Sequence, residues 1–347
     1  MKSNNLVFVW ASDFEDFTGE GILARSFIKS LFHNSNKKIN IKSNNAEYVF
    51  YKKRIKIIKY SNYKNNFVNK YLKVFCGLYY LWKGHILGHT TFYINYLPLW
   101  NFLLLILLPK KTNLGPITGG KFIIKEKSIN SYIRKYLFPF FFKFSVKIIS
   151  TKYKNFLFST RMLIEYLPKN LIQKSLFEVN LICFDELKII DRKDINYLFY
   201  YRIHSNKSNI FLKKLIINLT NQNEKVFIVG DYLEGKNLVN LGNISRNRLQ
   251  KYLSRTKFSL NSGENFYSLF ALDCISNDVD IFIDKKTYLK SNYFPKNNLH
   301  IIDYKYFDRS YVKILKTKKS KKISKKNILI KIKKELIKKI NKNFDII

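Results

Sequence analysis

Cysteine is scarce in this sequence of 347 residues, and its scarcity excludes two kinds of protein. The chain has only Cys76, Cys183 and Cys274, an odd number with wide spacing and no CxxC pair. This pattern indicates neither a disulfide framework nor a cysteine-ligated zinc site. His33, His85, His204 and His300 also lack the spacing of metal ligands. We therefore expect no bound metal, and a reducing compartment such as the cytoplasm.

Apolar runs long enough to cross a membrane are also missing. Residues 97–108 and 136–149 are rich in leucine and phenylalanine. Prolines near both ends limit the length of the first stretch, and Pro139, Lys143 and Lys147 interrupt the second. Both fall short of the roughly 18–20 apolar residues that a membrane span needs. We expect a protein that does not cross the membrane, although it can rest on its surface.

Targeting and common nucleotide-binding signatures are absent as well. The amino terminus has a short apolar run that ends before Asp13, which does not make a signal peptide. The GxGxxG pattern of dinucleotide-binding proteins and the GxxxxGK[ST] pattern of P-loop proteins do not occur. These absences argue against a dinucleotide-dependent oxidoreductase and against an NTPase.

Acids are few, and the formal net charge of +39 has two explanations. Lysine belongs to the residues of AT-rich codons, and it is scattered along the whole chain, which favours codon bias. The other explanation is an anionic partner: a phospholipid surface, a nucleic acid or a sugar phosphate. Codon bias along the whole chain leaves one local excess of lysine unexplained. Residues 311–343 hold 14 lysines and a single acid, Glu335.

The apolar pattern predicts two α/β domains. A hydrophobic fraction of 46% supports folded cores, and strands that alternate with helices predict parallel sheets. In the first half we expect strands at 6–10, 47–51, 55–60, 91–96 and 146–150, and helices at 22–32, 66–82, 99–108 and 131–144. In the second half we expect strands at 197–201, 226–229, 257–260 and 280–283, with helices at 209–219, 246–254, 267–275 and 323–340. We also expect a short turn at residues 240–242, and Ser245 as the N-cap of the helix at 246–254.

Domain boundaries follow from where the periodicity is lost. Acids cluster around residues 181–194, which indicates a hinge. We therefore predict an amino-terminal domain of residues 1–184, a second domain of residues 185–310, and a lysine-rich carboxyl-terminal helix and tail of residues 311–347. The helix is expected to pack through Leu329, Ile332, Leu336 and Ile340, or to rest on anionic lipid. The basic, aromatic residues 52–73 are a further candidate for the membrane surface.

Residues suited to a sugar-nucleotide site follow successive strands of the second half. Arg202 ends one strand, and Lys207 comes five residues later. Glu264 follows a later strand, and Tyr267, Ser268 and Leu269 open the next helix, with Asp273 inside it. Arginine, lysine and the N–H groups of a helix N-terminus neutralise phosphate oxygens. Because carboxylates accept hydrogen bonds from hydroxyl groups, acids suit the ribose and the sugar.

In these motifs the second half resembles the donor domain of GT-B glycosyltransferases, in particular family 4. That family has an Arg–x4–Lys pair, which Arg202 and Lys207 match, and a Glu–x7–Glu motif, whose first glutamate Glu264 matches. The resemblance implies that the pair holds the donor phosphates and that Glu264 faces the donor sugar. The second glutamate, which contacts the ribose, is replaced by Leu272, and Asp273 stands one position later. We expect Asp273 to make the ribose contact from that shifted position.

The first half is similar to the same family at three places. His89-Thr-Thr-Phe-Tyr resembles a histidine-bearing strand, which makes His89 a weak catalytic or acceptor-binding candidate. Residues 114–120 resemble a Gly-Pro-x-Gly-Gly-Gly stretch, with Thr118 in place of one glycine. Gly19-Glu20-Gly21 stands where the family has a glycine-rich loop on the acceptor side. These matches imply two Rossmann-like domains that face a central cleft.

The expected function is transfer of a sugar from a nucleotide-diphosphate donor to a glycan or lipid-linked acceptor. It requires no metal and no cofactor, and it fits a cytoplasmic protein on the inner face of the plasma membrane. Donor, acceptor and stereochemical outcome stay open. Two alternatives remain: a catalytically inactive relative that binds or assembles, and a basic nucleic-acid-binding protein. We expect no nucleic acid partner, because the aromatic residues follow core patterns and no recognition motif is present.

Overall fold

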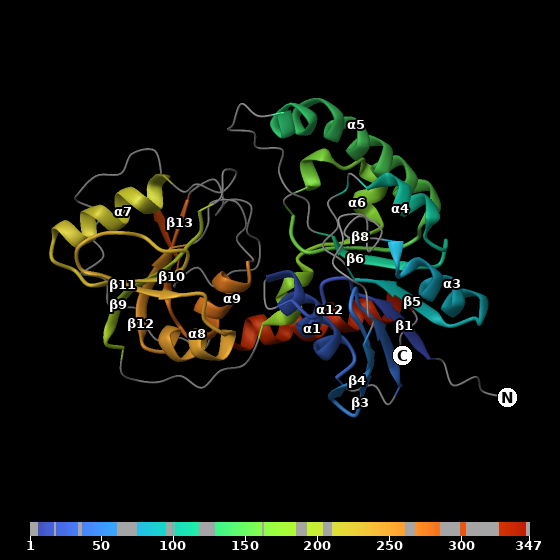
Figure 1. Cartoon of the computed structure of the whole chain (residues 1–347), viewed down its shortest axis with the longest axis horizontal. Coiled ribbons are helices and arrows are strands. Elements are labelled where there is room, and N and C mark those ends of the chain that lie inside the picture. Colours follow the sequence, from blue (N-terminus) through green and yellow to red (C-terminus); the bar gives the residue numbers. More distant parts are fainter. Residues whose placement is uncertain are drawn as a thin grey trace. The chain divides into compact units, whose positions relative to one another are not determined.

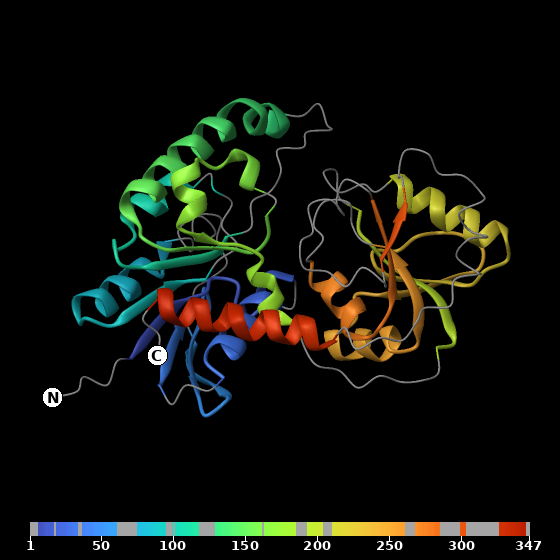
Figure 2. The same ribbon diagram turned by 180° about the vertical axis from the view of Figure 1, so that it is seen from behind.

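The computed structural model divides the chain into two compact units, Met1–Cys183 with Lys334–Ile347 and Phe184–Lys333 (Figure 1). It describes residues 6–16, 19–33, 37–60, 75–94, 99, 101–117, 129–161, 163–184, 193–203, 210–260, 268–284, 299–302 and 326–344. Figure 2 shows the same ribbon from behind, and in both views each unit contains its own sheet covered by helices.

The first unit is built on an eight-stranded sheet in the order β4-β3-β2-β1-β5-β6-β7-β8. The strands are β1 (Val7–Trp10), β2 (Ile39–Lys42), β3 (Ala46–Tyr51), β4 (Arg54–Tyr60), β5 (Thr90–Tyr93), β6 (Asn113–Ile117), β7 (Phe156–Phe158) and β8 (Ser175–Leu176). Only β2–β3 and β3–β4 pair in antiparallel fashion; the other neighbours are parallel. β1 lies inside this parallel part, and all four of its residues are buried, as strands covered on both faces are.

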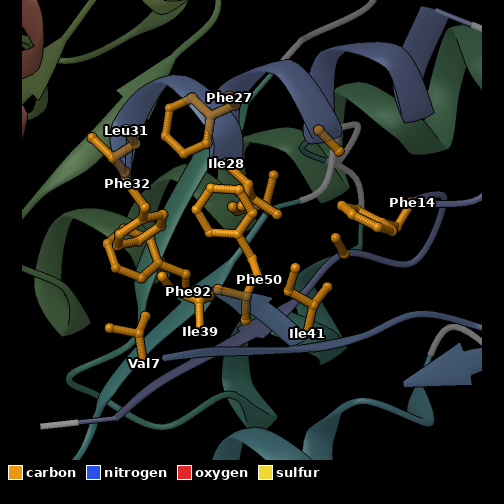
Figure 3. Packing of buried hydrophobic residues seen from close by; sticks show 14 of the residues in the cluster. Val7, Phe14, Phe27, Ile28, Leu31, Phe32, Ile39, Ile41, Phe50 and Phe92 are labelled. Carbon is orange, nitrogen blue, oxygen red and sulfur yellow. The ribbon is translucent and has the colours of Figure 1, made fainter. Parts of the chain in front are cut away.

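Helices cover both faces of this sheet, and each face has its own apolar core. The helices are α1 (Gly19–Leu31), α3 (Leu78–Ile86), α4 (Phe102–Leu107), α5 (Ile129–Lys152) and α6 (Lys169–Gln173), with 3₁₀ turns at Ile164–Tyr166 and Val179–Cys183. Because side chains alternate along a strand, Val7 and Val9 belong to the core beneath α1 (Figure 3), and Trp10 to the core beneath α3, α4 and α5.

The last helix, α12 (Lys326–Asn343), ends inside the first unit. Ile340 is fully buried and Phe344 is 3% exposed in the core beneath α1, with the Phe344 ring 6.0 Å from that of Phe92. Leu336 packs against the same core. The expected apolar stripe is therefore a packing surface, and residues 334–344 belong to the first unit instead of a separate tail.

The second unit has a six-stranded sheet in the order β11-β10-β9-β12-β13-β14, in which every pair is parallel. The elements are β9 (Ile195–Tyr201), α7 (Ile210–Asn221), β10 (Val226–Gly230), β11 (Leu238–Gly242), α8 (Arg246–Leu253), β12 (Thr256–Leu260), α9 (Leu269–Ser276), β13 (Asp280–Asp284) and β14 (Leu299–Ile302). Numbered along the chain, this is the 3-2-1-4-5-6 order of a doubly wound sheet, whose connections change direction between β9 and β12.

Several expectations about single elements were wrong. Residues 146–150 are not a strand, because α5 continues to Lys152 with Val146 and Ile149 buried one helical turn apart. The turn expected at residues 240–242 is the end of the edge strand β11. Five further strands, β2, β6, β7, β8 and β14, were not anticipated. The cap expected for α8 was confirmed, since Ser245 Oγ accepts a hydrogen bond from the Arg248 N–H.

Candidate functional site

The direction change between β9 and β12 marks the candidate site of the second unit. In doubly wound sheets, ligands bind outside the carboxyl ends of the strands at this point. Arg202 directly follows the carboxyl end of β9, and its side chain is exposed. Because the side chain is exposed, its guanidinium is accessible to an anion. The segment after β12 leads into α9, whose first turn belongs to the same edge.

Asp231 fixes the backbone from which Arg202 projects. Its carboxylate accepts a hydrogen bond from the N–H of Ile203, and its own N–H donates to the carbonyl of Tyr201 at 2.9 Å. Gly230, just before it, has φ of +107°, and a Cβ at this position would lie 2.2 Å from the Tyr201 carbonyl oxygen. Only glycine fits this junction without strain. The Gly230-Asp231 pair therefore positions Arg202, a role that sequence reasoning missed although the pair closes a predicted strand.

The helix that follows β12 has a serine N-cap. Ser268 Oγ accepts a hydrogen bond from the Ala271 N–H at 3.2 Å, so α9 begins at Leu269. The first N–H groups of a helix carry a partial positive charge. Ser268 and Leu269 are thus at the edge where they were expected. Lys207, Glu264 and Tyr267 lie outside the described residues.

Asp273, expected to contact the ribose, is held inside the unit by Arg246. Its side chain is 3% exposed, and Arg246 Nη2 donates to Oδ1 at 2.6 Å. Arg246 Nε lies 3.2 Å from Oδ1 and 3.1 Å from Oδ2, which completes a two-point contact. This pair joins the start of α8 to α9. A carboxylate so buried and so occupied does not support a direct ribose contact.

The carboxyl edge of the first sheet carries an acid that sequence reasoning did not single out. Asp13 follows β1, and its Oδ2 accepts a hydrogen bond from Ser12 Oγ at 3.2 Å. Burial raises the pKa of Asp13 and the Asp16 carboxylate adds to the rise, while hydrogen bonds from Ser12 and Glu20 oppose it. A carboxyl group with a raised pKa at a strand edge is a candidate for accepting or donating a proton.

The expected acceptor-side loop is part of a helix. Gly19, Glu20 and Gly21 form the first turn of α1. A Cβ on Gly21 would lie 2.2 Å from the Asp16 carbonyl oxygen and 2.5 Å from that of Asp13. Gly21 is therefore needed for close packing of α1 against the turn after β1, which is a structural reason for glycine here. A Cβ on Gly19 would meet nothing within 4 Å.

His89 lies at the wrong end of its strand for a site at the carboxyl edge. It precedes β5, whose first residue, Thr90, pairs with Val7 at the amino end of β1. The imidazole stacks on Phe8, with ring centroids 5.4 Å apart and an angle of 12° between the planes. This position gives His89 a packing role and does not support its catalytic or acceptor-binding candidacy.

Two features of the described residues bear on metals and membranes. No group of three or more His, Cys, Asp or Glu side chains within the described ranges could hold a metal ion. In the same ranges, no helix combines the length and the apolarity that crossing a bilayer requires.

Comparison with known proteins gives the fold. No protein-family model matches the sequence, and no curated protein is significantly similar to it. Among solved structures, a glycosyltransferase from Rickettsia africae matches with a TM-score of 0.53 and 11% identity, over 99% of this chain and 94% of that one. The fold is GT-B. The two parallel-sheet α/β units agree with it, and the resemblance to family 4 in particular stays a prediction.

Two other matches are weaker. The E. coli heptosyltransferase WaaC with ADP has a TM-score of 0.37 and 8% identity, over 89% of this chain and 98% of that one. The glycotransferase of kitacinnamycin has a TM-score of 0.41 and 7% identity, over 98% of each chain. Likeness at this level carries no weight for the site.

Proposed function

We propose that the protein is a glycosyltransferase that takes its sugar from a nucleotide-diphosphate donor bound at the carboxyl edge of the second sheet. One observation carries the proposal. Arg202 and the Ser268-capped N-terminus of α9 both belong to the carboxyl edge of the sheet, where they follow strands β9 and β12. The strand connections change direction between these two strands. In a GT-B fold this combination of an exposed guanidinium and helix N–H groups suits a diphosphate.

The carboxyl edge of the second sheet would act electrostatically in the reaction. When the sugar is transferred, the nucleoside diphosphate departs with additional negative charge. Arg202, Lys207 and the N–H groups at the start of α9 stabilise that charge, in the way that fixed donors stabilise a developing anion. Asp231 holds the turn that carries Arg202, and Glu264 is assigned to the hydroxyl groups of the donor sugar. Ribose binding is assigned to groups other than Asp273.

On the acceptor side we assign Asp13 as the group that takes the proton from the attacking hydroxyl. Its position after β1 and its raised pKa support this role. The acceptor is assigned as a glycan or lipid-linked glycan. Replacing Asp13 by asparagine keeps the side-chain shape but removes the base. The variant is expected to bind donor normally and to lose transfer at least about a hundredfold.

The test of the donor site uses nucleotide diphosphates and their sugars in thermal-shift and calorimetric titrations. Arg202→Ala is compared with Arg248→Ala, which removes an exposed arginine from α8 of the same unit. A hydrogen bond to a charged group contributes about 1.5–3 kcal/mol, so Arg202→Ala should weaken binding roughly 10- to 150-fold. Equal affinity of the two variants, or no binding of any nucleotide by the native chain, would remove the donor assignment.

A binding protein without transferase activity is the second candidate, and the buried pairing of Asp273 favours it, because a ribose-contacting acid is then lacking at that position. Slow hydrolysis of a bound nucleotide sugar separates the two. Measurable hydrolysis that Asp13→Asn or Arg202→Ala abolishes supports the enzyme, whereas binding with no turnover of donor supports the binding protein.

A further inference from the structure

Helices α3, α4 and α5 of the first unit expose large apolar side chains on their outer sides. The exposed fractions are 42% for Trp82, 52% for Leu103, 46% for Ile106, 47% for Leu107, 65% for Phe140 and 41% for Phe144. We call these six residues the α3–α5 face. A helix as uniformly apolar as α4, with the sequence FLLLIL, is normally buried on all sides. Its exposure indicates that something covers it.

Direct contacts join the three helices of the face. Trp82 Nε1 donates to the Leu107 carbonyl at 2.9 Å, which ties α3 to α4. The Phe102 ring lies 5.2 Å from that of Phe144, which ties α4 to α5. Figures 1 and 2 both show α4 and α5 side by side.

The last turn of α5 also holds the end of α4 in place. Lys152 Nζ donates to the carbonyls of Ile106 and Leu108 at 2.5 Å, and the buried Tyr153 hydroxyl donates to that of Leu105 at 2.6 Å. These bonds satisfy carbonyls that a helix end leaves without partners. The apolar side chains are therefore presented on a fixed scaffold.

The charge around the face has one sign. α3, α4 and α5 contain no acid, and Lys83, Lys143 and Lys147 are exposed on them. Between Tyr48 and Ile164 the sequence has a single acid, Glu126. Codon bias explains abundant lysine but not an acid-free apolar surface. Lysines of this kind extend their charged ends toward headgroups while their stems lie along apolar surface.

We propose that the α3–α5 face docks onto a membrane that contains anionic lipid, with the apolar side chains in the interfacial region and the lysines at the phosphate level. Aromatic side chains such as Trp82 favour this depth. A second copy of the chain is a poorer occupant, because two acid-free, lysine-bearing faces would repel each other. The proposal does not depend on the proposed function, since binding is measured without donor or acceptor.

The surface differs from those expected from the sequence. Leu336, Ile337 and Ile340 of α12 are used in the core of the first unit. The two apolar stretches that are too short for spans, residues 97–108 and 136–149, contain α4 and most of α5 instead. They resemble membrane segments in composition because their outer halves meet lipid and their inner halves meet protein.

The experiment is sedimentation of the full chain with vesicles of phosphatidylcholine alone, or with phosphatidylglycerol added. Binding is expected only with phosphatidylglycerol. Ile106→Ser with Phe140→Ser should lower the partition coefficient more than about tenfold. The control replaces Ile217 and Tyr232, which are 57% and 70% exposed in the second unit, by serine and should bind like the native chain.

Charge is tested separately by Lys143→Gln with Lys147→Gln, against Lys213→Gln with Lys214→Gln on α7, where both lysines are exposed. At about 1 kcal/mol per lysine near an anionic surface, the first pair should lower binding roughly 30-fold. Trp82 gives a local readout: its emission should shift to the blue with vesicles, and Trp82→Phe should remove most of that shift.

Three results would overturn the proposal. The first is equal binding of the face variants and their controls, and the second is failure of the native chain to bind any vesicle. The third is a dimer in vesicle-free solution that Ile106→Ser with Phe140→Ser converts to a monomer. That last result would assign the face to a contact between copies of the chain.

Discussion

Glu178 makes the stability of the first unit depend on pH in a direction opposite to that of most acids. Its carboxylate follows β8 and is 2% exposed, with Arg161 Nε 3.2 Å away as its ion-pair partner. Within the described residues, neither carboxylate oxygen accepts a hydrogen bond. Burial raises the pKa of Glu178 from 4.5 to about 7, and Arg161 opposes that rise only in part.

The sign follows from the raised pKa. The folded state holds the proton more tightly than the unfolded chain, so this group contributes stability that is fully present below about pH 4.5. The contribution is lost as the pH rises through about 7. Each pH unit of that window is equivalent to about 1.4 kcal/mol. The free energy of unfolding should therefore fall by about 3 kcal/mol on this account between pH 4.5 and pH 8.

Glu178→Gln isolates the effect, because glutamine resembles the protonated acid and does not ionise. The native chain and the variant should be nearly equally stable near pH 4.5, and the variant more stable by about 3 kcal/mol at pH 8. Urea unfolding followed by tryptophan fluorescence measures this in the first unit alone, since all three tryptophans, Trp10, Trp82 and Trp100, lie in residues 1–183.

The matched control is Glu335→Gln, which removes an exposed carboxylate of α12 within the same unit. Its difference from the native chain should stay flat over the same pH range. A flat difference for Glu178→Gln as well, or one that favours the native chain as the pH rises, would refute the account of a carboxylate destabilised by burial.

Three further substitutions and one matched control, Gly242→Ala, test the packing. Asp273→Asn leaves Arg246 with an uncompensated charge, so calorimetry should show a loss of about 3 kcal/mol in the second unit, while nucleotide affinity stays unchanged. Gly230→Ala forces a Cβ into the carbonyl at the end of β9 and should cost about 2 kcal/mol or more. Gly242→Ala, also at positive φ but with open space around it, should cost less. Phe344→Ala should cost about 3–5 kcal/mol in urea unfolding of the first unit.

Each of these has a contrary outcome. Loss of nucleotide affinity in Asp273→Asn without loss of stability would return Asp273 to the ribose. Equal effects at the two glycines would mean that backbone conformation alone, without the close carbonyl, governs the junction after β10. An unchanged first unit in Phe344→Ala would show that the end of α12 does not contribute to its core.

Local patterns in the sequence were sufficient where neighbouring residues alone decide the structure of an element. β1 was predicted because its residues form a short apolar run, and Ser245 was predicted as a cap because its hydroxyl has a local partner. Short strands such as β7 were missed, because three residues carry no usable periodicity. The end of α5 was predicted as a strand, since a proline and dense aromatics hide its helical spacing.

In the candidate site, too, some features could be predicted from the sequence and others depended on tertiary packing. Order along the chain sufficed to predict that Arg202 and Ser268 belong to the carboxyl edge of one parallel sheet, because strand polarity alone decides that. The partner of Asp273 could not be predicted, since Arg246 lies on another helix and their contact depends on how α8 and α9 pack. His89 was assigned by motif, and only the register of β5 against β1 put it at the opposite end.

The sequence by itself determined the fold class, the two α/β units and the strand ends from which a diphosphate site would be built. These follow from periodicity and chain order, which are local properties. Tertiary structure alone decided which acids are free, which are paired, and which apolar side chains stay exposed on α4 and α5. Those outcomes depend on neighbours distant in sequence, because burial and ion pairing arise only when separate elements pack together.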